Sequence, residues 1–128
     1  MDLTDLTLTE QAALLRRGAC SSREIVDAHL ARIARLDGKL HAYVEVYANE
    51  ARQLADAADR ARAGGLPLGP LHGLPICIKD LCDIDGRIGT IGSKMWAGRR
   101  ASATSATVER LLAAGMIPLG KTHMVEFA

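Results

Sequence analysis

The apolar and polar positions in the first part of the chain follow helical spacing and predict two helices that start at capping boxes. A capping box is a Ser or Thr followed by a Glu three residues later, and the pattern occurs at Thr7 and at Ser21. The first box introduces a short helix over residues 11–17. The second introduces a longer helix whose apolar side chains recur at i, i+4 and i+7, and which we expect to end at Gly38.

A strand and a third helix are predicted next. Residues 40–46 alternate between apolar and polar side chains, which is the period of a half-exposed strand. Small apolar side chains then recur at helical spacing from about residue 48 to residue 63, before Gly64 and Gly65 break the pattern. Such a stripe of small residues is suited to close packing of helices.

The second half of the chain predicts one strand, one helix and another strand. Residues 76–78 form a short apolar run, β-branched at two of its three positions, which is typical of a strand covered on both faces. Ser105 is a candidate N-cap for a helix over residues 106–114, and residues 116–119 follow as the next strand. Such a βαβ unit places its two strands parallel in one sheet. Pro118 removes a ladder donor and favours an irregular or edge position.

The composition is typical of a chain with one hydrophobic core and almost no net charge. The 128 residues are 48% hydrophobic and 24% charged, and 16 basic and 15 acidic side chains give a net charge of +1. The charges form no blocks, so nothing favours capture of nucleic acid or of an anionic membrane. No apolar run approaches the ~18 residues of a spanning helix, and the acidic start at Asp2 is wrong for a signal peptide. We expect a single domain in the cytoplasm.

The cysteine and histidine positions favour neither a disulfide nor a metal site. The cysteines are odd in number and lack a C-x-x-C spacing, so reduced, packed thiols are expected, with Cys77 in the core. The histidines are spread over a helix, a strand and loops, with no pair at i, i+4. His72 is near Lys79 in sequence, but a hydrogen bond from its ring to the backbone is the simpler expectation. We therefore expect no metal and no cofactor.

Lys79 follows the apolar run at the point where the strand opens into a loop. In open α/β sheets, ligands bind outside the carboxyl ends of parallel strands. A lysine flanked by apolar residues at such a place can lose enough hydration to act as a base. The alternative is that Lys79 only leaves the sheet and extends into solvent, as most strand-end lysines do. The residues alone leave both interpretations open.

The loop after Lys79 carries acidic residues and regularly spaced glycines. Three glycines share an interval of three residues: Gly86, Gly89 and Gly92. Their spacing predicts a backbone that approaches another group closely. Three acidic residues lie beside the lysine: Asp80, Asp83 and Asp85. We expect these to form turns rather than a carboxylate pair for glycoside chemistry.

Residues 115–122 match the P-loop pattern G-x-x-x-x-G-K-[ST], with Lys121 at the lysine position. A P-loop has a strand before its first glycine and a helix after its lysine. Here a helix is predicted before the first glycine, and the intervening residues are themselves a strand. We therefore expect no nucleotide binding.

Three segments of the second half resemble the amidase signature family. They are residues 69–80 (Gly-Pro-Leu-His-Gly-Leu-Pro-Ile-Cys-Ile-Lys-Asp), 90–93 (Thr-Ile-Gly-Ser) and 120–128 (Gly-Lys-Thr-His-Met-Val-Glu-Phe-Ala). The resemblance implies an α/β fold in which an N-terminal helical layer, residues 1–65, packs on a mixed central β-sheet with flanking helices. The sheet would begin within residues 66–128, with the strand that carries the lysine.

The resemblance also implies a chemistry. Members of the family hydrolyse a carboxamide C–N bond through a Ser-cisSer-Lys triad without a metal, and Lys79 matches the triad lysine. A small-molecule amide is the implied substrate, and a homodimer is expected by analogy alone. The family's glycine- and serine-rich segment, which supplies both serines, follows the motif that ends here at Phe127 and Ala128. Residues 1–128 alone are therefore expected to be inactive on amides.

Two alternatives remain open. The same family includes the transamidating subunit that converts mischarged glutamyl- or aspartyl-tRNA, which uses the triad on glutamine and passes ammonia to a partner subunit. In that case alone, nucleic acid would be a partner. The other alternative is a non-catalytic interaction module, an amidase-like fold retained for binding.

Overall fold

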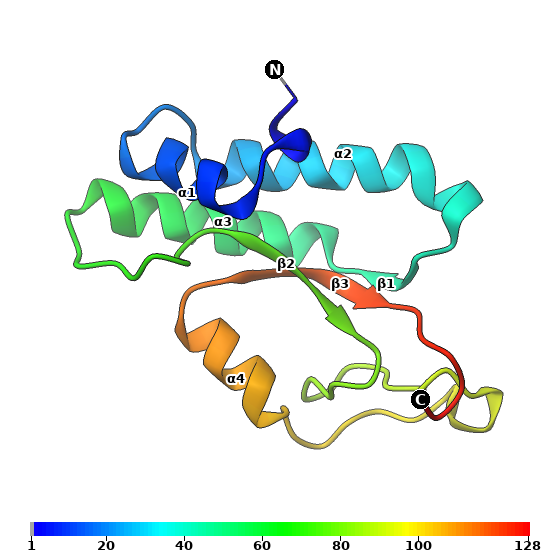
Figure 1. Ribbon diagram of the computed structural model, residues 1–128. Helices are drawn as coiled ribbons and strands as arrows, with labels where there is room; N and C mark the ends of the chain where they lie inside the picture. Colours follow the sequence, from blue (N-terminus) through cyan, green and yellow to red (C-terminus); the bar gives the residue numbers. More distant parts are fainter. Residues whose placement is uncertain (1) are drawn as a thin grey trace.

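The computed structural model describes residues 2–128 as a mixed α/β fold. In chain order the elements are η1 (Leu3–Asp5), α1 (Leu8–Arg16), α2 (Ser22–Leu40), β1 (Tyr43–Val46), α3 (Ala48–Ala63), β2 (Pro75–Lys79), η2 (Lys94–Trp96), α4 (Ala106–Ala113) and β3 (Ile117–Thr122). Figure 1 shows α1, α2 and α3 together on one side of the sheet and α4 on the other. The predicted order of elements is confirmed, with β1 inserted between the second and third helices.

Both predicted capping boxes form and set where α1 and α2 begin. Thr7 Oγ1 accepts from the backbone N–H of Glu10 (3.3 Å), and the Glu10 carboxylate accepts from the backbone N–H of Thr7 (2.7 Å). Ser21 and Glu24 repeat the arrangement at 3.1 and 2.8 Å. The hydrogen bonds from the backbone N–H groups lower the pKa of both glutamate carboxyls. Because each box is formed by residues three positions apart, the sequence alone predicts where the two helices start.

The end of α2 differs from the expectation. The helix continues past Gly38 to its last residue, Leu40, so the predicted end is wrong. The carboxylate of Asp37 accepts bonds from the backbone N–H groups of the two residues after the turn, at 2.7 and 3.3 Å. His41 takes the left-handed position at φ 51°. The turn is therefore placed by an aspartate side chain rather than by the glycine, and β1 begins at Tyr43 rather than at residue 40.

The sheet has three strands in the order β1, β3, β2. β3 runs parallel to β2 and antiparallel to β1, so the sheet is mixed and the parallel pair predicted for the βαβ unit is confirmed. β3 extends to Thr122, beyond the predicted end at residue 119. The carboxyl ends of β2 and β3 therefore lie side by side.

Pro118 lies next to an irregularity in the sheet. Ile76 pairs with Pro118, whereas Cys77 pairs with Gly120, so the register shifts by one residue of β3 between them. The expected irregular position is thus confirmed. The expectation named an irregular or an edge position, and the irregularity meets it although β3 is the central strand of the three. β1 pairs with β3 only from Gly120 onward, so at Pro118 the strand has a neighbour on one side only among the described strands.

Gly120 is required by the close approach of β1. A Cβ built on Gly120 would collide with the carbonyl oxygen of Glu45 and come within 3.0 Å of the Val46 Cα atom. Both are backbone atoms that move only if the strand moves. We expect Gly120→Ala to lower the free energy of unfolding by about 1–3 kcal/mol or more. Gly98→Ala is the matched control for urea unfolding, because nothing lies within 4 Å of its Cβ position. Equal midpoints for the two variants would contradict this packing.

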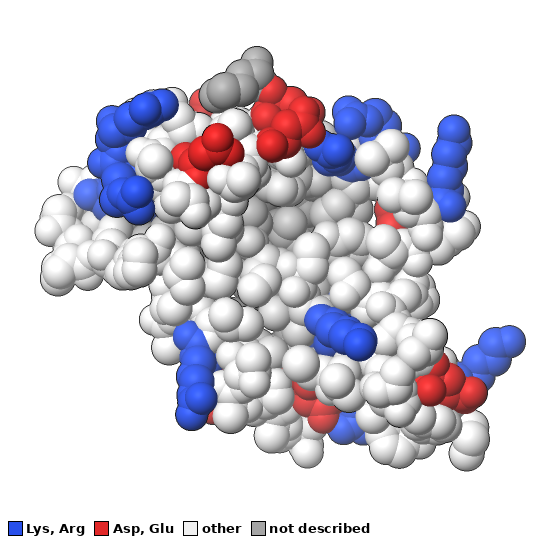
Figure 2. Space-filling model, in the orientation of Figure 1, with Lys and Arg blue, Asp and Glu red and all other residues white. Residues whose placement is uncertain are grey.

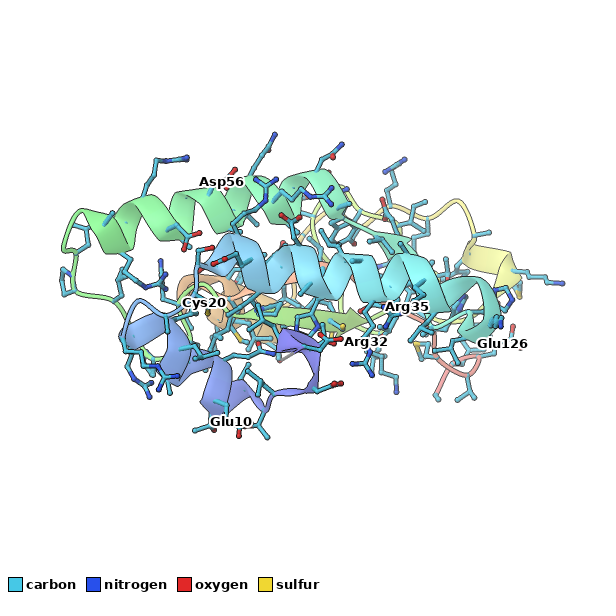
Figure 3. The ribbon with its side chains drawn as sticks, turned by 90° about the horizontal axis from the view of Figure 1, so that it is seen from above. Glu10, Cys20, Arg32, Arg35, Asp56 and Glu126 are labelled. Carbon is cyan, nitrogen blue, oxygen red and sulfur yellow. The ribbon has the colours of Figure 1, made fainter. Side chains whose placement is uncertain are left out.

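Two clusters of buried apolar side chains hold the helices on the sheet. The first joins α2, α3 and β3 and consists of Val26, Leu30, Ala51, Ala55, Ala58, Ile117 and Leu119. The second joins α1 to the start of α2 and to the segments before β2 and β3, and consists of Ala12, Leu15, Ile25, Leu74 and Met116. The predicted stripe of small residues on α3 belongs to the first cluster and lets α2 and α3 lie side by side (Figure 3). The stripe is therefore used inside the chain.

Charged side chains of both signs are interspersed over the face seen in Figure 2. Ion pairs link the outer faces of α2 and α3, with Arg23 Nη1 2.9 Å from Asp56 Oδ2 and Arg52 Nε 2.7 Å from Asp27 Oδ1. All four side chains are more than a third exposed, so solvent screens both pairs and each adds little to stability. Among residues 2–128 no helix is long and apolar enough to cross a membrane.

Candidate active site

Lys79 is the last residue of β2, where the strand opens into the following loop. Its backbone lies opposite Thr122, the last residue of β3, and the chain turns immediately, since the N–H of Cys82 donates to the Lys79 carbonyl at 2.9 Å. The side chain is exposed. The amino group of Lys79 is therefore presented to solvent at the carboxyl end of a parallel pair.

The face of β2 that carries Lys79 is open, contrary to the expectation of a strand covered on both faces. Cys77, two residues earlier on the same face, is exposed, so its predicted place in the core is wrong. Its Sγ lies 2.6 Å from the hydroxyl of Tyr43, a residue of β1, which lies on the other side of β3 from β2. Burial, followed by the hydrogen bond to Cys77, raises the pKa of Tyr43. This face thus presents a thiol, a phenol and an amine in one area.

Asp80 points to the opposite side from Lys79 and is completely buried. Its Oδ1 lies 3.2 Å from the amino group of Lys121, which is also completely buried. Its Oδ2 accepts from the backbone N–H and the hydroxyl of Thr90, at 3.1 and 2.5 Å. Lys121 also donates to the carbonyl oxygen of Ile88 at 3.5 Å. Asp80 lies in the turn after β2, as expected, but its carboxylate is also the centre of a buried network.

The loop that follows is held by a second pair. Arg99 donates to both carboxylate oxygens of Asp83, with Nη1 2.8 Å from Oδ1, and the hydrogen bonds from Arg99 lower the pKa of Asp83. Asp83 itself lies outside the turns of this loop, so the expected turn is wrong there and its carboxylate holds the loop through the ion pair. The predicted close approach of the glycine backbone is confirmed at Gly89, whose Cβ would lie 2.7 Å from both side chains of this pair, and at Gly92, whose Cβ would lie 2.7 Å from the Met124 carbonyl oxygen.

Ser93 and Ser105 are not exposed nucleophiles. Ser93 is buried, donates to Glu126 Oε1 at 2.7 Å and accepts from the backbone at the start of η2. Figure 3 shows Glu126 at the same end of the molecule as η2. Ser105 occupies the predicted N-cap position of α4, but its side chain makes no capping hydrogen bond, so it does not cap the helix.

His72 lies at the other end of β2 from Lys79, before the strand begins. Its ring packs against Gly115, whose Cβ would lie 2.5 Å from Nδ1. Its buried Nε2 has no hydrogen-bond partner among the described residues, so the expected bond from the ring to the backbone is wrong at that atom. The strand separates His72 from the lysine, and a rise of about 3.3 Å per residue over β2 rules out contact.

The P-loop pattern falls on elements in the wrong order for a phosphate site. α4 precedes Gly115, and the residues between the two glycines belong to β3. Lys121 is still within that strand and its amino group is engaged by Asp80. The residue that the motif would aim at a phosphate is thus enclosed in the core. Between residues 2 and 128, no three His, Cys, Asp or Glu side chains are grouped so that they could hold a metal ion.

Comparison with known sequences gives a consistent set of relatives. A family model described as Amidase matches residues 24–128. The chain is 46% identical over 127 residues to the A subunit of glutamyl-tRNA(Gln) amidotransferase from Salinispora arenicola, covering 99% of this chain and 26% of the relative. It is 47% identical over 124 residues to the protein of the same name from Chromohalobacter salexigens, covering 97% and 25%. The chain thus spans about a quarter of the length of these curated relatives.

Solved structures give the same result for the fold. The native peptide amidase from Stenotrophomonas maltophilia superposes with a TM-score of 0.88 at 33% identity, over 97% of this chain and 26% of that one. A bacterial aryl acylamidase that belongs to the amidase signature enzymes superposes with a TM-score of 0.87 at 27% identity, over 95% and 26%. The helical layer and the mixed sheet are thus arranged here as in these enzymes.

Proposed function

Since the chain belongs to the amidase signature family, we propose that the natural protein hydrolyses the C–N bond of a carboxamide and that Lys79 is its catalytic base. The observation that supports the assignment most is that Lys79 ends β2, at the carboxyl end of the parallel pair, within the segment that resembles the family's lysine motif. The second lysine at the same edge, Lys121, is enclosed and paired. Of these two amines, only that of Lys79 is therefore free to exchange a proton with a catalytic serine.

In the proposed reaction, neutral Lys79 accepts a proton through a bridging serine from a nucleophilic serine. That oxygen attacks the carboxamide carbon, and backbone N–H groups hold the tetrahedral oxyanion. The C–N bond then breaks as the proton passes to the leaving nitrogen, which departs as an amine or ammonia. Water hydrolyses the acyl ester and releases the acid. Both serines are carried over from the family's pattern and lie outside residues 1–128, so this polypeptide by itself is expected to be inactive.

The proposal is tested by measuring amine release from a defined panel. Purified natural protein is incubated with propionamide, benzamide, 4-nitroacetanilide and L-glutamine, and ammonia or 4-nitroaniline is quantified. The control is the Lys79→Ala protein purified in the same way, which reports any contaminating amidase. Release by the wild type well above this control is expected for at least one compound. Equal release by both preparations would contradict the proposal and favour the non-catalytic interaction module.

A second candidate is favoured by the names of the relatives. Several proteins that share 39–47% identity with this chain are named as the A subunit of glutamyl-tRNA(Gln) amidotransferase. If the natural protein acts in that way, glutamine would be its amide substrate and the released ammonia would pass to glutamyl-tRNA(Gln) through a partner subunit. The two functions separate on the panel. A hydrolase acts on the small carboxamides without any partner, whereas a transamidase uses glutamine and forms glutaminyl-tRNA(Gln) only when the partner is added.

Three further expectations remain predictions. The division into a helical layer over residues 1–65 and a sheet region over residues 66–128 is one, although β1 lies in the first part and joins the sheet. A homodimer is another, and the small-residue stripe of α3 does not support it because the stripe is buried within the chain. The cytoplasmic location is the third.

A further inference from the structure

The strongest unexplained feature of the molecule is the pair formed by Asp80 and Lys121. Both side chains have an exposed fraction of 0%, and their charged atoms lie 3.2 Å apart. Two charges taken out of water lose their hydration, so a pair of this kind contributes little stability compared with apolar residues of the same size. The proposed reaction uses neither residue. The pair therefore calls for a role other than stability, and the backbone segments that it joins indicate that role.

The pair holds the backbone on which Lys79 is placed. Asp80 follows Lys79 directly, and successive residues of a strand point to opposite faces, so the carboxylate is drawn into the core while the amine is exposed. Lys121 precedes Thr122, whose backbone lies opposite Lys79 and accepts the N–H of Asp80 at 3.0 Å. The ion pair thus fastens the ends of the two strands at the residue pair that carries the amine.

The same carboxylate fixes the loop beyond Lys79. Thr90 donates two hydrogen bonds to Asp80 Oδ2, and these bonds hold the two ends of the loop of residues 80–90 together. Within the same loop, the carbonyl oxygen of Ile88 accepts a hydrogen bond from Lys121. Beyond Thr90, the N–H of Phe127 donates to the carbonyl oxygen of Ile91 at 3.0 Å. One buried carboxylate therefore anchors both the strand end and the loop next to it.

From this arrangement we propose that Asp80, neutralised by Lys121 and hydrogen-bonded by Thr90, is a positioning residue that fixes the amino group of Lys79 in its working place. The proposal rests on the proposed function, since it presupposes that Lys79 is the base. A displacement of a base by as little as 1 Å lowers a rate by about 10²-fold, so a rigid anchor directly beside it has a large effect. In this proposal Lys121, the lysine of the P-loop pattern, supplies the counter-charge of the Asp80 carboxylate.

The test compares rate and affinity in variants of the natural protein, with the panel amide that the wild type hydrolyses fastest. Asp80→Asn keeps the size of the side chain and an acceptor for Thr90 but leaves Lys121 without a counter-charge. Thr90→Val removes the hydroxyl that donates to Asp80 and accepts from the backbone N–H of Gly92, but it removes no charge, so it folds even if the first variant does not. At a temperature well below each Tm, we expect kcat to fall about 10- to 100-fold for Asp80→Asn and severalfold for Thr90→Val. KM should stay within about threefold of the wild type.

The matched control is Leu30→Ala, a truncation in the cluster between α2, α3 and β3, remote from the end of β2. It lowers Tm through a cavity and should leave kcat unchanged when folded. Amide hydrogen exchange gives a readout that needs no activity, and exchange at Cys82 and Thr90 should quicken about tenfold in Asp80→Asn but not in Leu30→Ala.

The outcomes are distinguishable. A kcat within twofold of the wild type in folded Asp80→Asn and Thr90→Val overturns the positioning role, and so does an equal fall of kcat in Leu30→Ala. If the wild type releases no amine from any compound, the proposed function fails and the catalytic role of the anchor fails with it. Hydrogen exchange then decides whether Asp80 anchors the loop at all.

Discussion

Lys79→Ala is expected to lower kcat of the natural protein by about 10²- to 10⁴-fold or more, because the loss of a catalytic base removes proton transfer from the transition state. KM should change far less, since the amine is proposed to contact the serine relay rather than the substrate. Tm should remain at the wild-type value, because the side chain is exposed and its removal opens no cavity.

Lys94→Ala is the matched control for this prediction. Lys94 is exposed at the start of η2, so Lys94→Ala truncates the same kind of side chain without touching the strand end. Its kcat should equal that of the wild type. A Lys79→Ala protein that keeps most of its activity with an unchanged Tm would show that Lys79 only extends into solvent.

The second large effect concerns stability. Lys121→Met is expected to lower the free energy of unfolding by about 3–5 kcal/mol, because it leaves the buried Asp80 carboxylate without its counter-charge. Asp80→Asn should lose a similar amount for the complementary reason. The double variant removes both charges and keeps an acceptor for Thr90, so it should recover most of the loss. The free energies come from urea unfolding of the four proteins, evaluated as a double-mutant cycle.

Arg32→Met provides the comparison with a surface pair. Arg32 lies 2.6 Å from Asp5, but the two side chains are 41% and 67% exposed, so its removal should lower the free energy of unfolding far less than Lys121→Met does. If Lys121→Met costs no more than Arg32→Met, or if the double variant is as unstable as the sum of the single variants, the buried pair is not coupled as described.

The elements that local chemistry decides were predictable from the sequence. α1 and α2 begin where their capping boxes stand, and α3 ends where Gly64 and Gly65 follow its small-residue stripe. The end of α2 was not predictable in this way. Gly38 is the usual signal for a helix end, but the turn forms later because the Asp37 carboxylate accepts hydrogen bonds from backbone N–H groups beyond the helix.

In the candidate site, too, the sequence predicts what neighbouring residues determine and misses what the pairing of distant strands determines. Lys79 could be proposed as the base from the sequence because the strand signal and the motif are contiguous, and its role stays a prediction. The partnership of Asp80 with Lys121 was missed, because the two residues are 41 positions apart and only the register of β2 on β3 brings them together. An aspartate directly after a strand and a lysine within an apolar strand were the available signals. The exposure of Cys77 was missed since an apolar run does not reveal which of its faces is covered.

The central claim is that the amine of Lys79 itself is the base, and amine rescue tests it most directly. The natural protein with Lys79→Ala is assayed on its best panel amide with increasing ethylamine, and tetramethylammonium serves as a cation of equal charge that accepts no proton. The account predicts that activity returns in proportion to the concentration of unprotonated ethylamine and not with tetramethylammonium, and that Lys121→Met is not restored by either. Full activity of Lys79→Ala without any amine, or equal rescue by tetramethylammonium, would contradict it.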